Sequence, residues 1–306
     1  MLKYVIRRSL QAVLVVLGVS LIVFVMIRIT PGDPVRSYLG ESATDQQVSE
    51  YRHYLGLDEP LPMQYVRFLQ RAAVGDLGNS LFYHQPASTV LADHLPATLQ
   101  LSFVSLALAL LIAVPLGVLS AVRRDSFWDY LGMTLAMLGQ SLPAFWLGLV
   151  LMLVFAVNLH WLPTSGYGGL PFLVLPSVTL GAYMAGLFTR LVRSGLLEVL
   201  GEDYVRTARA KGLSEFAVVA RHALRNAMIP IITVLGLDFG AYLTGSILTE
   251  TIFSWPGLGR YVVNAIARRD LPAIQGSVLF LSAVFVLVNL ITDVAYAKAD
   301  PRVSYN

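Results

Sequence analysis

Side chains that could carry out catalysis or bind a metal are few in this sequence. Cysteine is absent, which excludes a thiolate metal site, a disulfide framework and a cysteine nucleophile. The histidines are His53, His84, His94, His160 and His222. None lies in the middle of an apolar segment, so a membrane-embedded serine protease or a haem protein would lack its catalytic or ligating groups. The chain also has no Gly-x4-Gly-Lys-Ser/Thr phosphate loop, and we expect that it does not hydrolyse ATP itself.

The composition indicates where the remaining polar groups must be positioned. Of the 306 residues, 56% are hydrophobic and only 13% are charged, whereas an average soluble domain carries roughly 25% charged residues. So few charges cannot cover a soluble surface, and intrinsic disorder is excluded for the same reason. The net charge is +3, but the basic residues are scattered among apolar runs, unlike the footprint of a nucleic-acid-binding protein. We therefore expect an all-α integral membrane protein without a nucleic-acid partner.

Six apolar segments are long enough to cross a bilayer, which requires about 20 mostly apolar residues. They cover residues 10–29, 98–122, 130–159, 172–189, 227–248 and 277–297. The first follows basic residues, as in a secretory signal, but its apolar run exceeds the roughly 7–15 residues of a signal core. We interpret it as an uncleaved span. The distribution of Lys and Arg between the connections predicts that both termini lie in the cytoplasm.

Three connections between these spans are too long to be simple turns. Residues 30–97 would lie outside and contain two segments of helical character, 45–57 and 62–74. Residues 190–226 would lie inside, and residues 249–276 would lie outside.

The inner connection contains a short helix with signals at both ends. Asp203 can cap its N-terminus, Arg209 and Lys211 fall in its last turn, and Gly212 can adopt the left-handed conformation that ends a helix. A second helix start follows at Ser214 and would continue into the fifth span. This segment is either a solvated hairpin that attracts lipid phosphates and sets the topology, or a rigid element that docks onto another protein.

Several short motifs occur in a fixed order along the chain. Residues 202–212 read Glu-Asp-Tyr-Val-Arg-Thr-Ala-Arg-Ala-Lys-Gly, and residues 222–227 read His-Ala-Leu-Arg-Asn-Ala. Pro-Gly-Asp-Pro stands at 31–34, Gly-Asp-Leu-Gly at 75–78 and Phe-Ser-Trp-Pro-Gly-Leu-Gly at 253–259. Over essentially its whole length the sequence resembles the permeases of binding-protein-dependent ABC importers, in the dipeptide, oligopeptide and nickel branch. The long outer connection after the first span resembles the first of the two permease subunits.

The resemblance implies a fold and a location. The fold would be a type I ABC importer permease bundle of six transmembrane helices in the bacterial cytoplasmic (inner) membrane. Residues 1–29 would form the cytoplasmic N-terminus and first transmembrane helix, and residues 30–93 an extracytoplasmic loop region. Residues 94–297 would form the transmembrane domain, with a cytoplasmic coupling loop at 190–226, and residues 298–306 a cytoplasmic tail.

The resemblance also implies partners. These are a second homologous permease, two ABC ATPase subunits that bind ATP and Mg, an extracytoplasmic solute-binding protein and membrane lipid; no cofactor is expected on this chain. The residues implied in ATPase coupling are Asp203, Tyr204, Val205, Arg206, Thr207, Ala208, Arg209, Lys211, Gly212, His222, Arg225 and Asn226. Tyr204, Val205 and Ala208 would supply apolar contacts to one ATPase. Arg206, Arg209 and Lys211 would supply ionic ones.

Polar groups within the spans are candidates for the translocation pathway. Asp238 is the one acid near the middle of a predicted span, where ionisable groups are functional candidates or pair with a structural partner. Gln140 and Ser141 either line the pathway or form hydrogen bonds between helices. Trp255 and Arg260 either contact the binding protein or pathway mouth, or anchor the chain at the membrane surface.

The expected solute is a dipeptide or oligopeptide, which is the largest group in this branch. Nickel or another metal chelate and glutathione are alternatives within the same branch, and residues 161–169 are similar to those of nickel permeases. An ion-driven secondary carrier is the alternative from a different class, although such a carrier usually shows repeated broken helices and more intramembrane acids.

Overall fold

The computed structural model describes residues 2–29, 32–40, 42–228, 231, 234–235 and 246–299. The chain divides into two compact units, which we treat separately: residues 1–98 with 256–306 form unit 1, and residues 99–255 form unit 2. Most of the described residues are helical, with an isolated bridge between Asn79 and Pro86 as the extended pairing.

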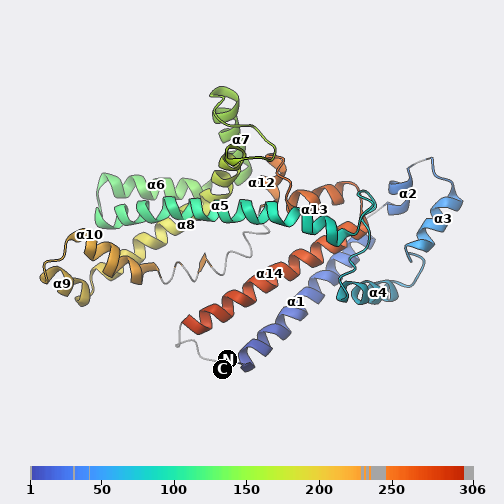
Figure 1. The fold of residues 1–306 in the computed structure, drawn as a ribbon, viewed down its shortest axis with the longest axis horizontal. Coiled ribbons are helices and arrows are strands. Elements are labelled where there is room, and N and C mark those ends of the chain that lie inside the picture. The colour runs from blue at the N-terminus through green and yellow to red at the C-terminus, as the bar shows by residue number, and fades with distance from the viewer. Residues whose placement is uncertain are drawn as a thin grey trace. The chain divides into compact units, whose positions relative to one another are not determined.

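Unit 1 contains two long apolar helices that lie side by side, α1 (Leu2–Ile29) and α14 (Leu271–Ala299) (Figure 1). They run in opposite directions, so that the beginning of α1 and the end of α14 lie at the same end of the pair (Figure 1). A core cluster that includes Leu91, Leu258, Tyr261 and Ile274 joins the start of α5 (Ala87–Val122) to α13 (Leu258–Ala267) and α14. Both long helices exceed the spans predicted at 10–29 and 277–297.

Three short helices form the connection after α1: α2 (Pro34–Leu39), α3 (Asp45–Tyr54) and α4 (Leu61–Ala73). The predictions of helices near 45–57 and 62–74 are confirmed. A capping box starts α3, since the Thr44 side chain accepts from the Gln47 backbone N–H while the Gln47 side chain bonds the Thr44 backbone N–H. The connection is therefore folded rather than a loose loop.

Unit 2 is a packed helical body. It contains the remainder of α5, then α6 (Phe127–Ser141), α7 (Ala144–Leu151), the π-helical segment η1 (Met152–Asn158), α8 (Leu170–Leu200), α9 (Asp203–Ala210), α10 (Glu215–Ala217), the π-helical segment η2 (Val218–Ala223) and α12 (Ile247–Ile252). Glycines allow these helices to approach closely: a Cβ at Gly181 would lie 2.8 Å from the Ser105 carbonyl oxygen, and one at Gly139 would lie 2.7 Å from that of Ala182.

The segment predicted as a span over 130–159 is not one straight helix. The helix axis turns by 107° between α6 and the segment Ala144–Asn158. Pro143 explains the break, because a proline disfavours helical geometry in the residue before it, and Leu142 is extended with ψ 129°. The described residues thus hold four helices that are long and apolar enough to cross a membrane, or five if the bent pair is one span. The predicted span 227–248 lies mostly outside the described residues.

The boundaries of two other spans also differ from the predictions. The helix predicted at 98–122 begins at Ala87, and the helix predicted at 172–189 continues to Leu200. The second difference matters for the inner connection, since residues predicted to form part of that loop are the last turns of α8. The connection therefore starts at Gly201 and is a compact hairpin.

Candidate functional site

We define the inner hairpin as residues 201–226, which comprise α9, α10, η2 and the turns between them. Its first helix starts at Asp203 with Glu202 as the N-cap residue, and no side-chain hydrogen bond caps it. The prediction that Asp203 caps the helix is therefore wrong. The Asp203 carboxylate instead pairs with Arg206, three residues later, at 3.4 Å. Because Asp203 is the first helical residue, its negative charge is favourable at the helix N-terminus.

The turn between the two helices follows the predicted signals. Gly212 has φ +77°, a left-handed conformation that side-chain-bearing residues rarely adopt. A Cβ at this position would meet nothing within 4 Å, so backbone conformation rather than crowding favours glycine here. Ser214 then caps α10, with its hydroxyl oxygen accepting from the Ala217 N–H at 3.4 Å. Both predictions are confirmed.

The apolar face of α9 is covered by the chain itself. Val205 is fully buried and Ala208 is 5% exposed, and both pack with Val218 from η2. Val199 and Leu200 at the end of α8 pack against this cluster. The predicted apolar contacts of Val205 and Ala208 with an ATPase are therefore corrected: these side chains have no surface to offer a partner and instead hold the hairpin against α8.

Polar bonds close the hairpin on its outer side. The Arg209 guanidinium donates to both carboxylate oxygens of Glu215, at 2.8 and 3.3 Å. The Asn226 side-chain amide donates to the Tyr204 hydroxyl at 2.7 Å, and the Thr207 hydroxyl donates to the Asp203 carbonyl at 2.9 Å. The Arg209 and Asn226 contacts thus link α9 to α10 and to the helical residues 224–228 that follow η2.

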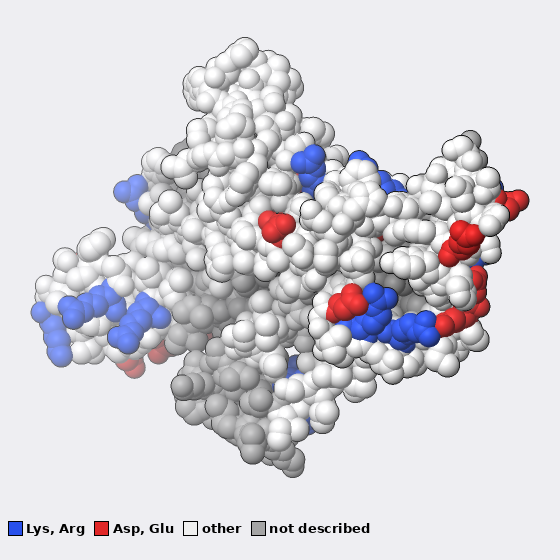
Figure 2. Space-filling model, turned by 45° about the vertical axis from the view of Figure 1, so that its right-hand side comes forward, with Lys and Arg blue, Asp and Glu red and all other residues white. Residues whose placement is uncertain are grey.

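The exposed side of the hairpin is basic. The Arg206 side chain is 73% exposed, and Lys211 and Arg225 are exposed as well, while His222 is half-buried. Figure 2 shows Lys and Arg side chains gathered at the left edge of the view, over the end that carries α9 and α10 in Figure 1. The exposed surface of this hairpin is therefore positively charged. Its buried side packs against the end of α8.

The predicted pathway residues lie in different surroundings. The Gln140 side-chain oxygen accepts from Arg190 at 2.6 Å, so Gln140 bonds between α6 and α8, and Ser141 is exposed where α6 ends. Trp255 is fully buried, 4.8 Å from the Tyr167 ring between centroids, which contradicts both a surface anchor and a contact with a partner. Arg260 is half-buried on α13. Asp238 lies outside the described residues.

Sequence reasoning missed the main charged contact of unit 2. Asp129 on α6 is 3% exposed and accepts two hydrogen bonds of 2.7 Å from Arg193 on α8. The Asp125 backbone N–H donates to the same carboxylate at 3.0 Å. A paired, fully bonded carboxylate of this kind fixes two helices in register. The signal in the sequence was an acid in the first turn of a long apolar helix.

Comparison with known proteins matches nearly the whole chain to two families. Residues 113–305 match the family described as "Binding-protein-dependent transport system inner membrane component", and residues 1–102 match the family of its N-terminal region. The glutathione transport system permease protein GsiC of Salmonella paratyphi A is 46% identical over 305 residues, and GsiC of Escherichia coli K12 is 44% identical; both alignments cover 100% of each chain.

Two solved structures share the fold. One is the MetNI methionine ABC transporter in inward-facing conformations, with a TM-score of 0.58 at 20% identity over 69% of this chain and 96% of that chain. The other is an amino acid ABC transporter, with a TM-score of 0.52 at 14% identity over 71% of this chain and 95% of that chain. These similarities concern the fold.

Proposed function

The chain belongs to the family of inner-membrane components of binding-protein-dependent transport systems, and on that premise we propose that its solute is glutathione. It is a multi-pass permease subunit of an ABC importer, the coarser function predicted from the sequence. The relatives that match from end to end are glutathione permeases. The prediction of dipeptides or oligopeptides is not confirmed, and the glutathione alternative has better support than peptides or nickel. Glutathione is itself a tripeptide, so the proposed solute is still a short peptide.

We propose that the inner hairpin transmits movement from an ATPase to the pathway. The exposed basic face, with Arg206 and Lys211, would contact the ATPase, while the buried apolar face holds the hairpin to the end of α8. That helix is continuous for 31 residues, and the Asp129–Arg193 pair ties it to α6. A push on the hairpin would thus move two pathway helices together, which a loose loop could not achieve.

The assembly that this proposal requires contains a second homologous permease, two ATPase subunits and an extracytoplasmic binding protein. ATP and Mg would be bound by the ATPases, so the energy for transport comes from outside this chain. The inner hairpin and both termini would face the cytoplasm, and the connection that contains α2, α3 and α4 would face the opposite side.

Uptake by the reconstituted complex tests the proposal. The permease pair, ATPases and binding protein would be placed in liposomes with ATP and Mg on the ATPase side, and labelled glutathione, a labelled dipeptide and nickel would be offered in parallel. We expect ATP-dependent accumulation of glutathione and weaker accumulation of the dipeptide. Uptake of the dipeptide or nickel without glutathione uptake would refute the choice of solute, and uptake by this chain alone would refute the coupling.

A further inference from the structure

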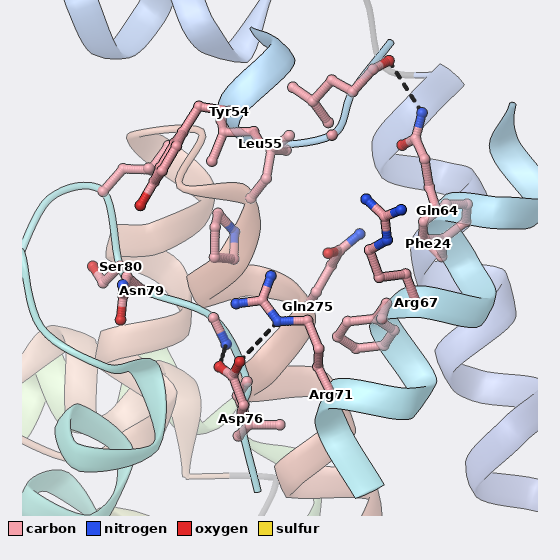
Figure 3. Close-up of a pocket in the computed structure, with 18 of the residues that line it drawn as sticks. Phe24, Tyr54, Leu55, Gln64, Arg67, Arg71, Asp76, Asn79, Ser80 and Gln275 are labelled. Carbon is pink, nitrogen blue, oxygen red and sulfur yellow. Dashed lines mark hydrogen bonds and ion pairs between the residues drawn. The ribbon is translucent and has the colours of Figure 1, made fainter. Parts of the chain in front are cut away.

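Unit 1 contains a cavity of about 710 Å³ that the proposed transport function does not use. Its walls come from the end of α1, from α3 and α4, from residues 76–86 and from the start of α14. Figure 3 shows Arg67 and Arg71 from α4 and Gln275 from α14 pointing into the same space. The volume lies within the roughly 300–1,000 Å³ range of small-molecule pockets.

Three residues that line this cavity each carry a buried side-chain polar atom with no hydrogen-bond partner among the described residues. These atoms are Nη1 of Arg28, Oε2 of Glu59 and Nε2 of Gln275. An unpartnered buried polar group costs about 1–3 kcal/mol, and more when it is charged. Native structures contain few such groups, and several around one cavity indicate that something else supplies their partners.

Hydrogen bonds and a ring contact fix the position of the Arg28 side chain. Its Nε and Nη2 donate to Oε1 of Gln64 at 3.1 and 3.0 Å, and its guanidinium carbon lies 4.7 Å from the centre of the Phe24 ring. Gln64 is fixed in turn, because its amide donates to the carbonyl oxygens of Leu57 and Glu59. The remaining guanidinium nitrogen therefore has a defined position and an unused donor.

The other charges of the cavity are already paired. Arg67 contacts Oε1 of Glu59 at 2.7 Å, and Arg71 contacts Asp76 at 2.8 Å. No ion pair joins Arg28 to an acid within the described residues, so its positive charge is not neutralised there. Glu59 keeps its second oxygen free as an acceptor. The cavity thus offers a cationic donor, an amide donor and a carboxylate acceptor.

We propose that this cavity binds a small zwitterion that carries both a carboxylate and an ammonium group, such as a short peptide. The carboxylate would accept from Arg28 and Gln275, and the ammonium group would donate to Glu59. Phe68 and Tyr54 in the lining supply apolar and aromatic contacts for the body of the ligand. The proposal rests on the proposed function only for the choice of glutathione as one of the probes.

Calorimetry on the assembled permease–ATPase complex in nanodiscs, without the binding protein, tests this site. The probes are triglycine and glutathione, each compared with its carboxyl-esterified and its N-acetylated form. We expect both unmodified peptides to bind and both kinds of blocked analogue to bind at least tenfold more weakly, because each lacks one of the charged ends.

Variants locate the binding in the cavity. Arg28→Gln removes the free cationic donor and should weaken triglycine binding roughly tenfold to a hundredfold, and Gln275→Met should weaken it less. Arg52→Gln is the matched control, because Arg52 pairs with Asp33 in the same connection and does not line the cavity. Glu59→Gln tests the ammonium end and should affect the N-acetylated peptides least.

The outcomes separate this site from the proposed function. Failure of triglycine to bind at millimolar concentration, or binding that Arg28→Gln and Gln275→Met leave unchanged, would overturn the site even if glutathione is imported. Binding of triglycine that depends on Arg28, together with absent glutathione uptake, would support the site and refute the proposed solute.

Discussion

The inner hairpin and the cavity of unit 1 are both polar regions next to apolar helices, yet they are built in opposite ways. In the hairpin the apolar residues Val205 and Ala208 face inward, and the bonds of Arg209 and Tyr204 are made within the chain. In the cavity, polar atoms of Arg28 and Gln275 are buried and unpartnered within the described residues. A region whose groups are satisfied internally can transmit a force, whereas a region with unsatisfied groups is suited to hold a ligand.

The largest effect is expected from a charge inside the hairpin. Val205→Asp buries a carboxylate in the cluster with Ala208 and Val218, at a cost of about 3 kcal/mol or more. We expect the hairpin to detach from α8 and ATP-dependent uptake to fall to background, while ATPase activity persists without transport. Ala210→Ser, on the exposed side of the same helix and outside the proposed ATPase contact, is the control for folding. Normal uptake with Val205→Asp would show that the buried face does not matter.

A smaller effect is expected at the turn. Gly212→Val places a β-branched residue at φ +77°, which costs roughly 1–2 kcal/mol. We expect a several-fold loss of uptake at unchanged membrane abundance. Gly201→Ala is the matched control, because Gly201 has φ −81° and only an ordinary contact near its Cβ position. Equal losses in the two variants would contradict the importance of the left-handed turn.

Loss of one hydrogen bond should have a still smaller effect. Tyr204→Phe removes the acceptor of the Asn226 amide, and the freed amide lies near the surface, where water can replace the bond. We expect a loss of about 0.5–1.5 kcal/mol in hairpin stability. Hydrogen exchange of α9 in the assembled complex would measure it. A protection loss as large as that of Val205→Asp would contradict the ranking.

The smallest effect is expected at the Asp76–Arg71 pair, in the connection between α1 and α5, and it depends on pH. Hydrogen bonds from Arg71 and from the Gly78 N–H hold the pKa of Asp76 below its ordinary value. A lowered carboxyl pKa stabilises the fold above the unfolded pKa of about 3.9, and this contribution is lost as the pH falls through the folded value. Because the pair is about half exposed, the effect should stay below about 1 kcal/mol.

Asp76→Asn tests that dependence. Limited proteolysis of the connection between α1 and α5 should become faster in the parent chain only below about pH 4. In the Asp76→Asn variant, the rate of proteolysis should not show this increase below about pH 4. Acid sensitivity that is identical in the two proteins would show that the Asp76 pair contributes nothing.

Local signals explain what could be predicted from the sequence. The turn at Gly212, the cap at Ser214 and the helices near 45–57 and 62–74 depend on neighbouring residues, and all were predicted. The break at Pro143 also has a local cause, but the apolar character on both sides concealed it. The family resemblance implied apolar contacts for Val205 and Ala208, but it did not indicate that the chain itself covers them.

Long-range contacts could not be predicted in the same way. Trp255 looked like an exposed aromatic residue in an outer loop, and only the packing of Tyr167 against it shows that it is buried. The pairing of Asp129 with Arg193 requires the helix register of α6 and α8. Arg28 and Gln275 line the same cavity although they are far apart in the sequence. No short motif predicts such a long-range proximity.

Thiol labelling tests the central claim about the hairpin most directly. The natural sequence has no cysteine, so Arg206→Cys and Arg52→Cys each introduce a single thiol at an exposed position. We predict that a membrane-impermeant maleimide labels Arg52→Cys on intact cells and labels Arg206→Cys only after permeabilisation, and that a short bifunctional reagent links Arg206→Cys to an ATPase subunit. Labelling of Arg206→Cys from outside intact cells would contradict the account.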